Sequence, residues 1–328
     1  MDLLTGATGF LGHHLAARLG RDGRKLRTIV RVGTDLRRIP REVTEIVWGE
    51  IGDPETLARA MAGVDVVFHT AARVSGGGSR DAFARDNVAA AEGLLRAAEA
   101  AGVRRFVHVS SAGIYGAGQR GAAIDESTPL DPGIERRGFY AWSKAESDRL
   151  VRAFATQSKL ETVVVRPGIL YGGEAQPFIA RLQFPVPRGK GRRVIVGSRR
   201  ALLPLTHVDN ACDAIALAAD RGTSGAAYSV IDGAARQGEY LDLHAAHGVA
   251  SVRPTFVPPF VLWPVALGCE VVGRLARRSL PLTRYKLKRA TESLSYDTSA
   301  ARDGLGWTPN VDLPSGVRGM AADGPTAR

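Results

Sequence analysis

The fold is decided by the first stretch of the chain, Asp2-Leu3-Leu4-Thr5-Gly6-Ala7-Thr8-Gly9-Phe10-Leu11-Gly12. Its first four residues suit a short buried strand, and a helix-like stretch follows the glycine-rich turn as far as about Gly20. Gly6 permits a tight turn, Gly9 lets the backbone approach a pyrophosphate, and Gly12 lets the helix pack closely on the strand. The amides that begin this helix are expected to point at phosphate groups. A turn without a ligand is the alternative, because the spacing is G-x-x-G-x-x-G and not G-x-G-x-x-G.

Short apolar runs alternate with helix-like stretches through the first half of the chain. Strands are predicted at 2–5, 26–31, 45–47, 64–69, 105–110 and 161–165, and helices at 10–20, 54–62, 87–101 and 140–155. Strands separated by helices of this length predict a parallel sheet covered on both faces. Because such crossovers are right-handed, we expect an α/β fold with a doubly wound Rossmann sheet.

The pattern changes after Arg166-Pro167-Gly168, where prolines and glycines become frequent and only 203–207 and 227–231 resemble strands. We expect this half to pass between the sheet and a smaller, discontinuous C-terminal substrate lobe. The predicted dinucleotide-binding domain comprises residues 1–165 and about 203–232, and the lobe about 166–202 and 233–315. Residues 316–328 are rich in Gly, Ala and Pro and are expected to form a flexible tail.

The composition is that of a globular protein, with 45% hydrophobic and 23% charged residues among 328. The formal net charge of +11 is compatible with a nucleic acid, an anionic surface or a phosphorylated ligand. The arginines are spread along the chain without a long basic block, so we expect a solvated basic surface and no nucleic-acid partner. Cys212 and Cys269 form no CxxC pair and no ligand cluster with the seven histidines, which predicts free buried thiols and no metal site.

The chain opens directly on the first strand and its glycine turn, which predicts no signal peptide and a cytoplasmic location. No apolar run reaches the roughly 18 residues of a membrane span without interruption. The segment 256–272 comes nearest, but it contains Pro258, Pro259, Pro264 and Glu270. We interpret it as a buried helix of the substrate lobe and keep contact with a membrane surface as the alternative.

The second strand is expected to end at the adenosine ribose. NAD-preferring sites have an acidic residue there, whereas this strand ends Thr28-Ile29-Val30-Arg31, with Arg37 and Arg38 close behind. A guanidinium pairs well with a 2′-phosphate, so NADP is favoured, and NAD is the alternative if Arg31 only stacks on adenine. Glu50, after the third strand, is a candidate acceptor for the adenine amino group.

Tyr140-Ala141-Trp142-Ser143-Lys144 places a phenol and an amine on one face of a helix, one turn apart. A phenol near pKa 10 is a poor base at neutral pH, and a nearby ammonium is expected to lower that pKa. The pair would then donate a proton to a ketone or accept one from an alcohol. By itself a Tyr-x-x-x-Lys spacing is common by chance.

Hydroxyl groups at the end of the strand Val107-His108-Val109-Ser110-Ser111 add weight to this interpretation, because ligands lie beyond the carboxyl ends of such strands. We expect Ser111 to hydrogen-bond the reacting oxygen, and Ser110 is the rival for that role. Asn87 is predicted to begin the helix after the fourth strand. A helix cap and a role in ordering the active site are both open for it.

Together these features resemble the extended short-chain dehydrogenase/reductase superfamily, also called the NAD-dependent epimerase/dehydratase family. The resemblance rests on Thr5–Gly12, Val67–Ala72, Asn87, Ser110–Gly116, Tyr140–Lys144, Arg166–Gly172 and His207–Asn210. It implies a catalytic triad of Ser111, Tyr140 and Lys144, hydride transfer at nicotinamide C4, and a homodimer. We expect cofactor contacts at Gly6, Thr8, Gly9, Phe10, Leu11, Gly12, Arg31, Glu50, Ile51, Ala71, Ala72, Asn87, Tyr140, Lys144 and Pro167.

The branch of the superfamily bears on the substrate. Nucleotide-sugar enzymes usually carry an Arg-Asp-aromatic triplet before His-Val-Asp, and here the matching stretch is Leu203-Pro204-Leu205-Thr206. The apolar segment from Pro254 to Leu282 is similar to the 3β-hydroxysteroid dehydrogenase-like and dihydroflavonol reductase-like branches, and an apolar pocket suits a hydrophobic substrate. We therefore expect an NAD(P)-dependent oxidoreductase that interconverts a hydroxyl and a carbonyl on an apolar small molecule.

Two other functions are alternatives. A nucleotide-sugar epimerase or dehydratase with tightly bound cofactor would need Arg199 or Arg200 to replace the missing guanidinium. A cofactor-sensing regulator that keeps the fold is disfavoured by the intact Ser111, Tyr140 and Lys144.

Overall fold

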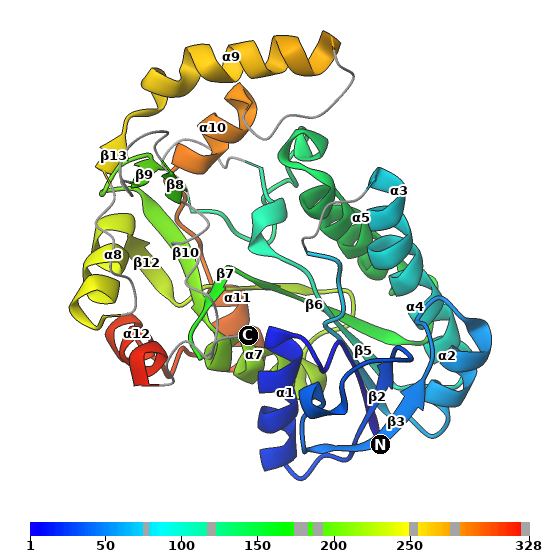
Figure 1. Cartoon of the computed structure of the whole chain (residues 1–328). Coiled ribbons are helices and arrows are strands. Elements are labelled where there is room, and N and C mark those ends of the chain that lie inside the picture. The colour runs from blue at the N-terminus through cyan, green and yellow to red at the C-terminus, as the bar shows by residue number, and fades with distance from the viewer. Residues whose placement is uncertain are drawn as a thin grey trace.

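The computed structural model of the chain describes residues 1–74, 79–116, 123–173, 183–185, 193–248, 255–275 and 283–322. A parallel sheet of seven strands lies at its centre (Figure 1). The strands are β1 (Asp2–Thr5), β2 (Leu26–Val30), β3 (Val43–Trp48), β4 (Val66–His69), β5 (Arg105–Val109), β6 (Glu161–Pro167) and β11 (Ala227–Val230). Their spatial order is β11-β6-β5-β4-β1-β2-β3, so the direction of winding reverses between β1 and β4. Because open α/β sheets bind ligands at such a switch point, the sheet itself indicates where the site lies. The predicted Rossmann fold is confirmed.

Helices cover both faces of this sheet. They are α1 (Phe10–Arg21), α2 (Pro54–Met61), α3 (Arg80–Phe83), the π-helical turn η2 (Ala84–Ala89), α4 (Ala90–Ala100), α5 (Phe139–Phe154), α7 (Val208–Arg221) and α11 (Ser299–Leu305). Successive strand residues point to opposite faces. Leu3 therefore packs with Leu57 of α2 and Leu94 of α4, whereas Leu4 packs with Leu15 of α1 on the other face. The cluster around Leu4 also contains residues of α7 and α11 and the buried Trp307, which follows α11.

Two small three-stranded sheets lie outside the central sheet. One contains β7 (Ile169–Tyr171), β10 (Leu202–His207) and β12 (Gly233–Arg236), and the other β8 (Gln183–Pro185), β9 (Arg193–Val196) and β13 (Thr255–Val257). The helices beside them are α8 (Gln237–Ala246), α9 (Pro259–Leu275), α10 (Arg284–Thr291) and α12 (Leu313–Ala322), and short 3-10 turns are η1 (Leu36–Arg38), η3 (Ala112–Ile114) and η4 (Ile134–Arg137). β10 belongs to a small sheet and β11 to the central one, so the chain leaves the central sheet and returns. The proposed domain boundaries stay a prediction.

Three expectations about single segments are corrected. The flexible tail expected from residue 316 is helical as far as Ala322, because Val317 and Met320 bury their side chains against Tyr171 and Leu205. Residues 259–272 of the segment 256–272 belong to an exposed helix, α9, in place of the buried one expected, and Phe256 and Val257 belong to β13. Neither α9 nor any other helix of the described chain is long and apolar enough to cross a membrane. Cys212 is buried as expected, but Cys269 on α9 is only partly buried.

The helix expected to start at Asn87 starts at Arg80. Its cap is Ser79, whose hydroxyl accepts a hydrogen bond from the Ala82 amide, so Asn87 is not a cap. The first two turns carry alternating charges and little apolar periodicity, which hid them in the sequence. Asn87 instead lies in the π-helical turn η2, where α3 passes into α4. Such turns often occur at functional sites.

Candidate active site

The glycine turn between β1 and α1 has the geometry expected of a phosphate cradle. Gly6 has φ +77°, and a Cβ there would lie 2.7 Å from the Ala71 amide nitrogen. A Cβ at Gly12 would lie 2.1 Å from the Gly6 carbonyl oxygen, so only glycine permits this approach of α1 to the turn. Gly9 is the N-cap of α1, and no side chain caps the helix. The free amides and the open backbone at Gly9 fit a pyrophosphate, as the sequence predicts.

The loop after β4 is tied to the end of β1. The Thr70 hydroxyl donates to the Thr5 carbonyl at 2.8 Å, and the Ala71 amide donates to Thr5 Oγ1 at 3.4 Å. Ala71 and Ala72, both partly buried, therefore lie beside the glycine turn at the switch point of the sheet. This is the position that the sequence predicts for two cofactor contacts.

Lys144 joins helix α5 to the end of β5. Its Nζ donates to the Val109 carbonyl oxygen at 2.7 Å, and its side chain is buried. The next two residues after Val109 are Ser110 and Ser111, so the amine lies where the strand delivers its hydroxyl groups. Burial lowers the pKa of Lys144 to about 8, and Asp148, one turn further along α5, opposes that shift. The amine therefore gains and loses its proton close to physiological pH.

Tyr140 occupies the first turn of α5, after Gly138 with φ +124°. Burial raises the pKa of Tyr140 to about 12, which corrects the expectation that the neighbouring amine lowers it. The reason is that Lys144 directs its ammonium to the Val109 carbonyl, while the phenol loses hydration on folding. At neutral pH the phenol carries its proton and is suited to donate it.

Asn87 links three parts of the site. Its side-chain oxygen accepts from the Arg73 amide at 2.7 Å, and its Nδ2 donates to the Arg73 carbonyl at 3.1 Å, which fixes the loop after β4. The same Nδ2 donates to Ser143 Oγ at 2.8 Å, and Ser143 Oγ donates to the Tyr140 carbonyl at 2.9 Å. Sequence reasoning missed Ser143, which stands between Tyr140 and Lys144 in the Tyr-x-x-x-Lys stretch. Its inward position on α5 is the signal that could have identified it.

The two candidate serines differ in their surroundings. Ser111 is partly buried and is the N-cap of the turn η3. Its Oγ accepts a hydrogen bond from the Gly113 amide at 3.1 Å, which leaves its own proton available. Ser110 is buried, and its Oγ has no hydrogen-bond partner within the described part of the chain. The accessible hydroxyl that can donate outward is Ser111.

A buried ion pair braces the helix that carries Tyr140 and Lys144. Arg166, at the end of β6, makes two hydrogen bonds to Asp148 of 2.6 and 2.9 Å, and both side chains are almost completely buried. The Arg166 guanidinium also donates to the Tyr115 hydroxyl at 2.7 Å. The sequence motif around Arg166 does not by itself identify the partner of this guanidinium. The position of Asp148, one helical turn after Lys144, is the sequence feature that could have indicated a buried acidic partner for Arg166. Pro167, an expected cofactor contact, is the buried last residue of β6.

The residues expected at the adenosine end lie on the other side of the switch point. Arg31 follows β2 and is exposed, as is Glu50 after β3, whereas Ile51 packs against the core beneath the sheet. Arg38 reaches back to the phosphate turn, where its guanidinium donates to the Thr8 carbonyl at 3.4 Å. Phe10 and Leu11 pack on the core below α1. Arg31 and Glu50 thus follow two neighbouring strands, β2 and β3, without a direct contact to Tyr140.

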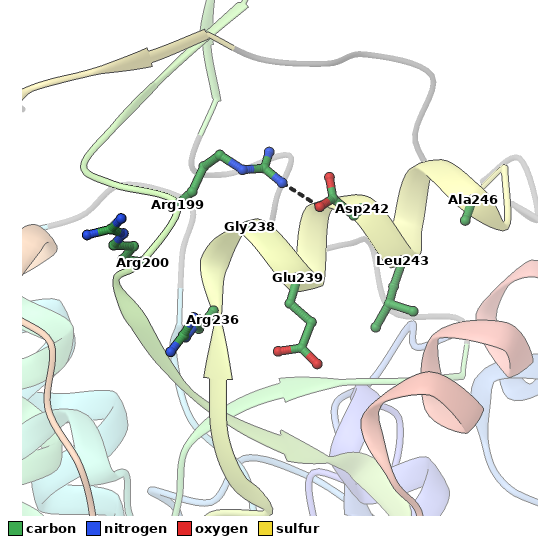
Figure 2. A pocket seen from close by; sticks show the side chains of 8 residues that line it. All are labelled: Arg199, Arg200, Arg236, Gly238, Glu239, Asp242, Leu243 and Ala246. Atoms are coloured by element: carbon green, nitrogen blue, oxygen red, sulfur yellow. Dashed lines mark hydrogen bonds and ion pairs between the residues drawn. The ribbon is translucent and has the colours of Figure 1, made fainter.

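A second group of arginines lies away from these residues. A pocket of about 670 Å³ lies between the segment before β10 and helix α8. Figure 2 shows the residues that line it, among them Arg199, Arg200 and Arg236. Arg199 forms an ion pair with Asp242 of α8 (Figure 2). None of Ser111, Tyr140 and Lys144 lines this pocket. Arg199, one candidate for the missing diphosphate ligand, is therefore already paired with a carboxylate.

Comparison with known proteins identifies the family. Residues 3–231 match the model of the NAD dependent epimerase/dehydratase family. The chain belongs to this family. A ketoreductase of Stigmatella aurantiaca that acts on a 4-hydroxy-2-methyl-3-oxo-4-farnesyl-3,4-dihydroquinoline-1-oxide is 35% identical over 70% of this chain and 68% of that protein. The 3 beta-hydroxysteroid dehydrogenase/Delta 5-->4-isomerase of Mycobacterium tuberculosis is 32% identical over 70% of this chain and 64% of its own length.

The fold of this epimerase/dehydratase-family chain also resembles solved structures along its whole length. The crystal structure of gox2253 superposes with a TM-score of 0.82 at 27% identity, and the match covers 98% of this chain and 97% of that one. The family and its relatives confirm the resemblance to the extended short-chain dehydrogenases/reductases. The chain is an NAD(P)-dependent dehydrogenase or reductase of this type.

Proposed function

We propose that this enzyme reduces a carbonyl group on an apolar small molecule, with NADPH as the favoured cofactor and Tyr140 as the proton donor. The observation that carries the proposal is the 2.7 Å hydrogen bond from Lys144 to the Val109 carbonyl. It joins the helix that bears Tyr140 to the strand end that bears Ser111, at the carboxyl edge of the sheet where ligands bind.

Each residue then has a separate task. When bound at the glycine turn, NADPH would supply the hydride for the carbonyl carbon. The Tyr140 phenol gives its proton to the carbonyl oxygen, so that an alcohol results, and solvent returns a proton to the phenolate. Ser111 donates a hydrogen bond to the same oxygen, since its Oγ already accepts from Gly113. Lys144 holds the helix of Tyr140 against the strand end that bears Ser111 through the Val109 carbonyl, and it would also hold the nicotinamide ribose of a bound cofactor.

The state of the phenol favours the reductive direction. With a pKa near 12, Tyr140 is protonated at neutral pH before the reaction begins. A protonated phenol acts as the acid that reduction needs, whereas oxidation of an alcohol needs the phenolate.

The apolar substrate is supported by what the relatives are named for. A farnesylated quinoline oxide and a steroid are both large and mostly hydrocarbon. The stretch between Pro254 and Leu282 lends no support, because α9 turns most of its apolar side chains to solvent. The proposal of an apolar substrate therefore rests on the names of the relatives. It also rests on Leu203, which stands where nucleotide-sugar enzymes usually have an arginine.

The experiment is a cofactor-coupled assay. Purified enzyme is incubated with NADPH or NADH and a panel of steroid, prenylated and aliphatic ketones, and absorbance at 340 nm is followed. We expect NADPH consumption with apolar ketones. Tyr140→Phe should retain NADPH binding and lose turnover by about 10²-fold or more, since it lacks the proton. Tyr240→Phe is the matched control, because the buried Tyr240 hydroxyl has no partner among the described residues. Full activity in Tyr140→Phe would remove Tyr140 from the reaction.

A nucleotide-sugar epimerase or dehydratase is the second candidate, favoured by the pocket with Arg199, Arg200 and Arg236. In such an enzyme the hydride leaves and returns within one cycle. Conversion of a sugar nucleotide without net change at 340 nm, abolished by Arg200→Ala, would favour this function over the reductase.

A further inference from the structure

Two histidines are buried side by side at the carboxyl ends of the neighbouring strands β4 and β5. His69 is the last residue of β4, and His108 lies one residue before the end of β5. They are register partners on parallel strands, so their side chains point to the same face of the sheet, and their ring centres are 5.3 Å apart. The layer around them is apolar and includes Val67 and Phe106. Neither ring has a task in the reaction proposed above, so two buried polar rings here need another explanation.

The hydrogen bonds of His69 fix its tautomer. The Ala71 amide can only donate, and it donates to Thr5 Oγ1 at 3.4 Å. The proton of the Thr5 hydroxyl is therefore directed to its other neighbour, His69 Nδ1, at 2.8 Å. Because a neutral imidazole carries a proton on one nitrogen only, we assign the proton of His69 to Nε2.

The hydrogen bonds of His108 give the same tautomer. The Lys144 backbone carbonyl can only accept, and it accepts from Ser147 Oγ at 3.1 Å. Since the single proton of this hydroxyl is used there, Ser147 Oγ accepts from His108 Nε2, which lies 3.2 Å away. The proton of His108 is thus on Nε2, and its Nδ1 is an acceptor.

Three buried polar atoms in this region have no hydrogen-bond partner among the residues that the structure describes. They are His69 Nε2, His108 Nδ1 and Ser110 Oγ. By the tautomers assigned above, the first is a donor and the second an acceptor, so they are complementary. Ser110 is two residues beyond His108, and its amide continues the strand ladder by donating to the Val165 carbonyl at 2.8 Å. Its side chain therefore points to the same face of the sheet as the two rings.

A single water matches all three atoms. It would accept from His69 Nε2, donate to His108 Nδ1 and form its third hydrogen bond with Ser110 Oγ, and three is the usual number for a buried water. Two nitrogens that share one water are about 4.5–5 Å apart, and rings with centres 5.3 Å apart accommodate this separation. Such a water would also remove the cost of three buried groups without partners.

We propose that His69, His108 and Ser110 bind one water, which completes a one-way chain of hydrogen bonds from the loop after β4 to helix α5. The chain starts at a backbone donor, the Ala71 amide, and ends at a backbone acceptor, the Lys144 carbonyl. Neither end can be reversed, so every hydroxyl and ring between them has one orientation. The three residues are positioning residues, because they hold the turn of α5 that bears Lys144 against the loop with two expected cofactor contacts.

The charge of Lys144 is compatible with this arrangement. Burial, followed by the Lys144 ammonium, lowers the pKa of His69 to about 3. Burial, then Lys144 and then His69 hold the pKa of His108 well below its usual value. Both rings are therefore neutral at pH 7. An imidazolium has no acceptor nitrogen, so protonation of either ring would interrupt the chain.

A crystal structure of the full-length enzyme and NMR of the enzyme labelled with ¹⁵N-histidine test the water directly. We expect electron density for one water within about 3.2 Å of all three atoms. We also expect the Nε2–H tautomer for both rings, with the signals assigned by their loss in His69→Gln and His108→Gln. A direct contact between the rings without a water, or an Nδ1–H tautomer for either ring, overturns the proposal.

Kinetics tests the positioning role, which rests on the proposed reductase function. His108→Gln keeps a donor for Ser147 and an acceptor for the water, whereas His108→Leu keeps only the volume. We expect His108→Gln to retain kcat within about threefold and His108→Leu to lose about tenfold or more, both with the KM for NADPH within about twofold. His244→Leu is the matched control with unchanged kcat. His244 is also fully buried, and its Nε2 has no partner in the described chain, but it lies on α8.

Thermal unfolding verifies that each variant folds. A folded His108→Leu that is at least as active as His108→Gln reduces His108 to a packing residue and overturns the positioning role. If the wild type reduces no ketone, the proposed function fails, and the density and the tautomers still decide whether the chain exists. The same two measurements decide it if His108→Leu does not fold.

Discussion

The side-chain Nδ2 of Asn87 donates a hydrogen bond to Ser143 Oγ at 2.8 Å, and Ser143 Oγ donates to the Tyr140 carbonyl at 2.9 Å. The π-helical turn that carries Asn87 thereby contacts the first turn of α5, although 56 residues separate Asn87 and Ser143. Because Asn87 also holds the backbone of Arg73 through two hydrogen bonds, the loop after β4 and the proposed acid share one support.

Asn87 is expected to act as a positioning residue. Asn87→Ala should lower kcat about tenfold or more and leave the KM for NADPH within about twofold, because Tyr140 loses its alignment. Ser143→Ala should have a similar effect, and the double variant should be no worse than either, as expected for one network. Steady-state kinetics of the three variants measures this, and fully additive losses would contradict it.

Gly12 is required for the close approach of α1 to the phosphate turn. Gly12→Ala would bring a Cβ within 2.1 Å of the Gly6 carbonyl oxygen, so we expect lost NADPH binding and a fall in unfolding free energy of about 1–3 kcal/mol. Gly319→Ala is the control, also helical but with nothing within 4 Å, and should be neutral or stabilising. Calorimetry and urea unfolding compare the two. Cofactor binding that survives in Gly12→Ala would mean that the turn tolerates displacement.

Two buried histidines should make the enzyme sensitive to acid. Burial, followed by the charge of Lys144, lowers the pKa of His69 to about 3, and the same causes hold the pKa of His108 well below its usual value. Between about pH 6.5 and 3 these two imidazoles are protonated in the unfolded chain and neutral in the folded one. The free energy of unfolding therefore falls as the pH drops through this range. For His69 the loss should be about 2 kcal/mol between pH 6.5 and pH 5, and His108 should add to it in the same direction.

Urea unfolding at pH 7, 6 and 5 measures that slope. His69→Gln should flatten it, although the variant loses the 2.8 Å contact with Thr5 and starts from a lower stability. His13→Gln, at an exposed position of α1, should leave the slope unchanged. An equally steep loss of stability in His69→Gln would assign the acid sensitivity to other groups.

Arg31 is expected to select NADPH over NADH. Arg31→Asp removes the partner for the 2′-phosphate and supplies an acceptor for a ribose hydroxyl, so the preference should move towards NADH by about tenfold or more. Arg41→Asp changes charge equally at an exposed position paired with Glu42. The ratio of kcat/KM for the two cofactors is the measurement, and an equal shift in both variants would reduce the effect to net charge.

Much of the fold followed from local pattern. The strands were predictable because strands buried on both faces of a sheet are nearly continuous apolar runs. The glycine turn was predictable because no other residue fits at Gly6 and Gly12. The early start of the helix at Arg80 was not, since charged residues fill its first turns. The exposure of α9 was not predictable either. The sequence of α9 shows that the segment is apolar, but whether other residues cover the helix depends on parts of the chain that are far away in sequence.

The site was predictable to the same extent. The spacing of Tyr140 and Lys144 predicted that they share one face of a helix. The direction of the Tyr140 pKa shift was not predictable, because the Lys144 amine donates its hydrogen bond to the Val109 carbonyl. The links from Asn87 to Ser143 and from Asp148 to Arg166 cross between elements far apart in sequence, and no local pattern reports them.

The order of the strands bears on how the protein is made. The cluster around Leu4 is completed by Ala301, Leu305 and Trp307, and β11 joins the sheet only after the excursion through the small sheets. During translation this face of the sheet is therefore covered in stages, first by α1 and later by α7, and it stays incomplete until the residues around α11 have been synthesised. A chaperone that shields hydrocarbon surface would be needed longest on the side of α1 and α7.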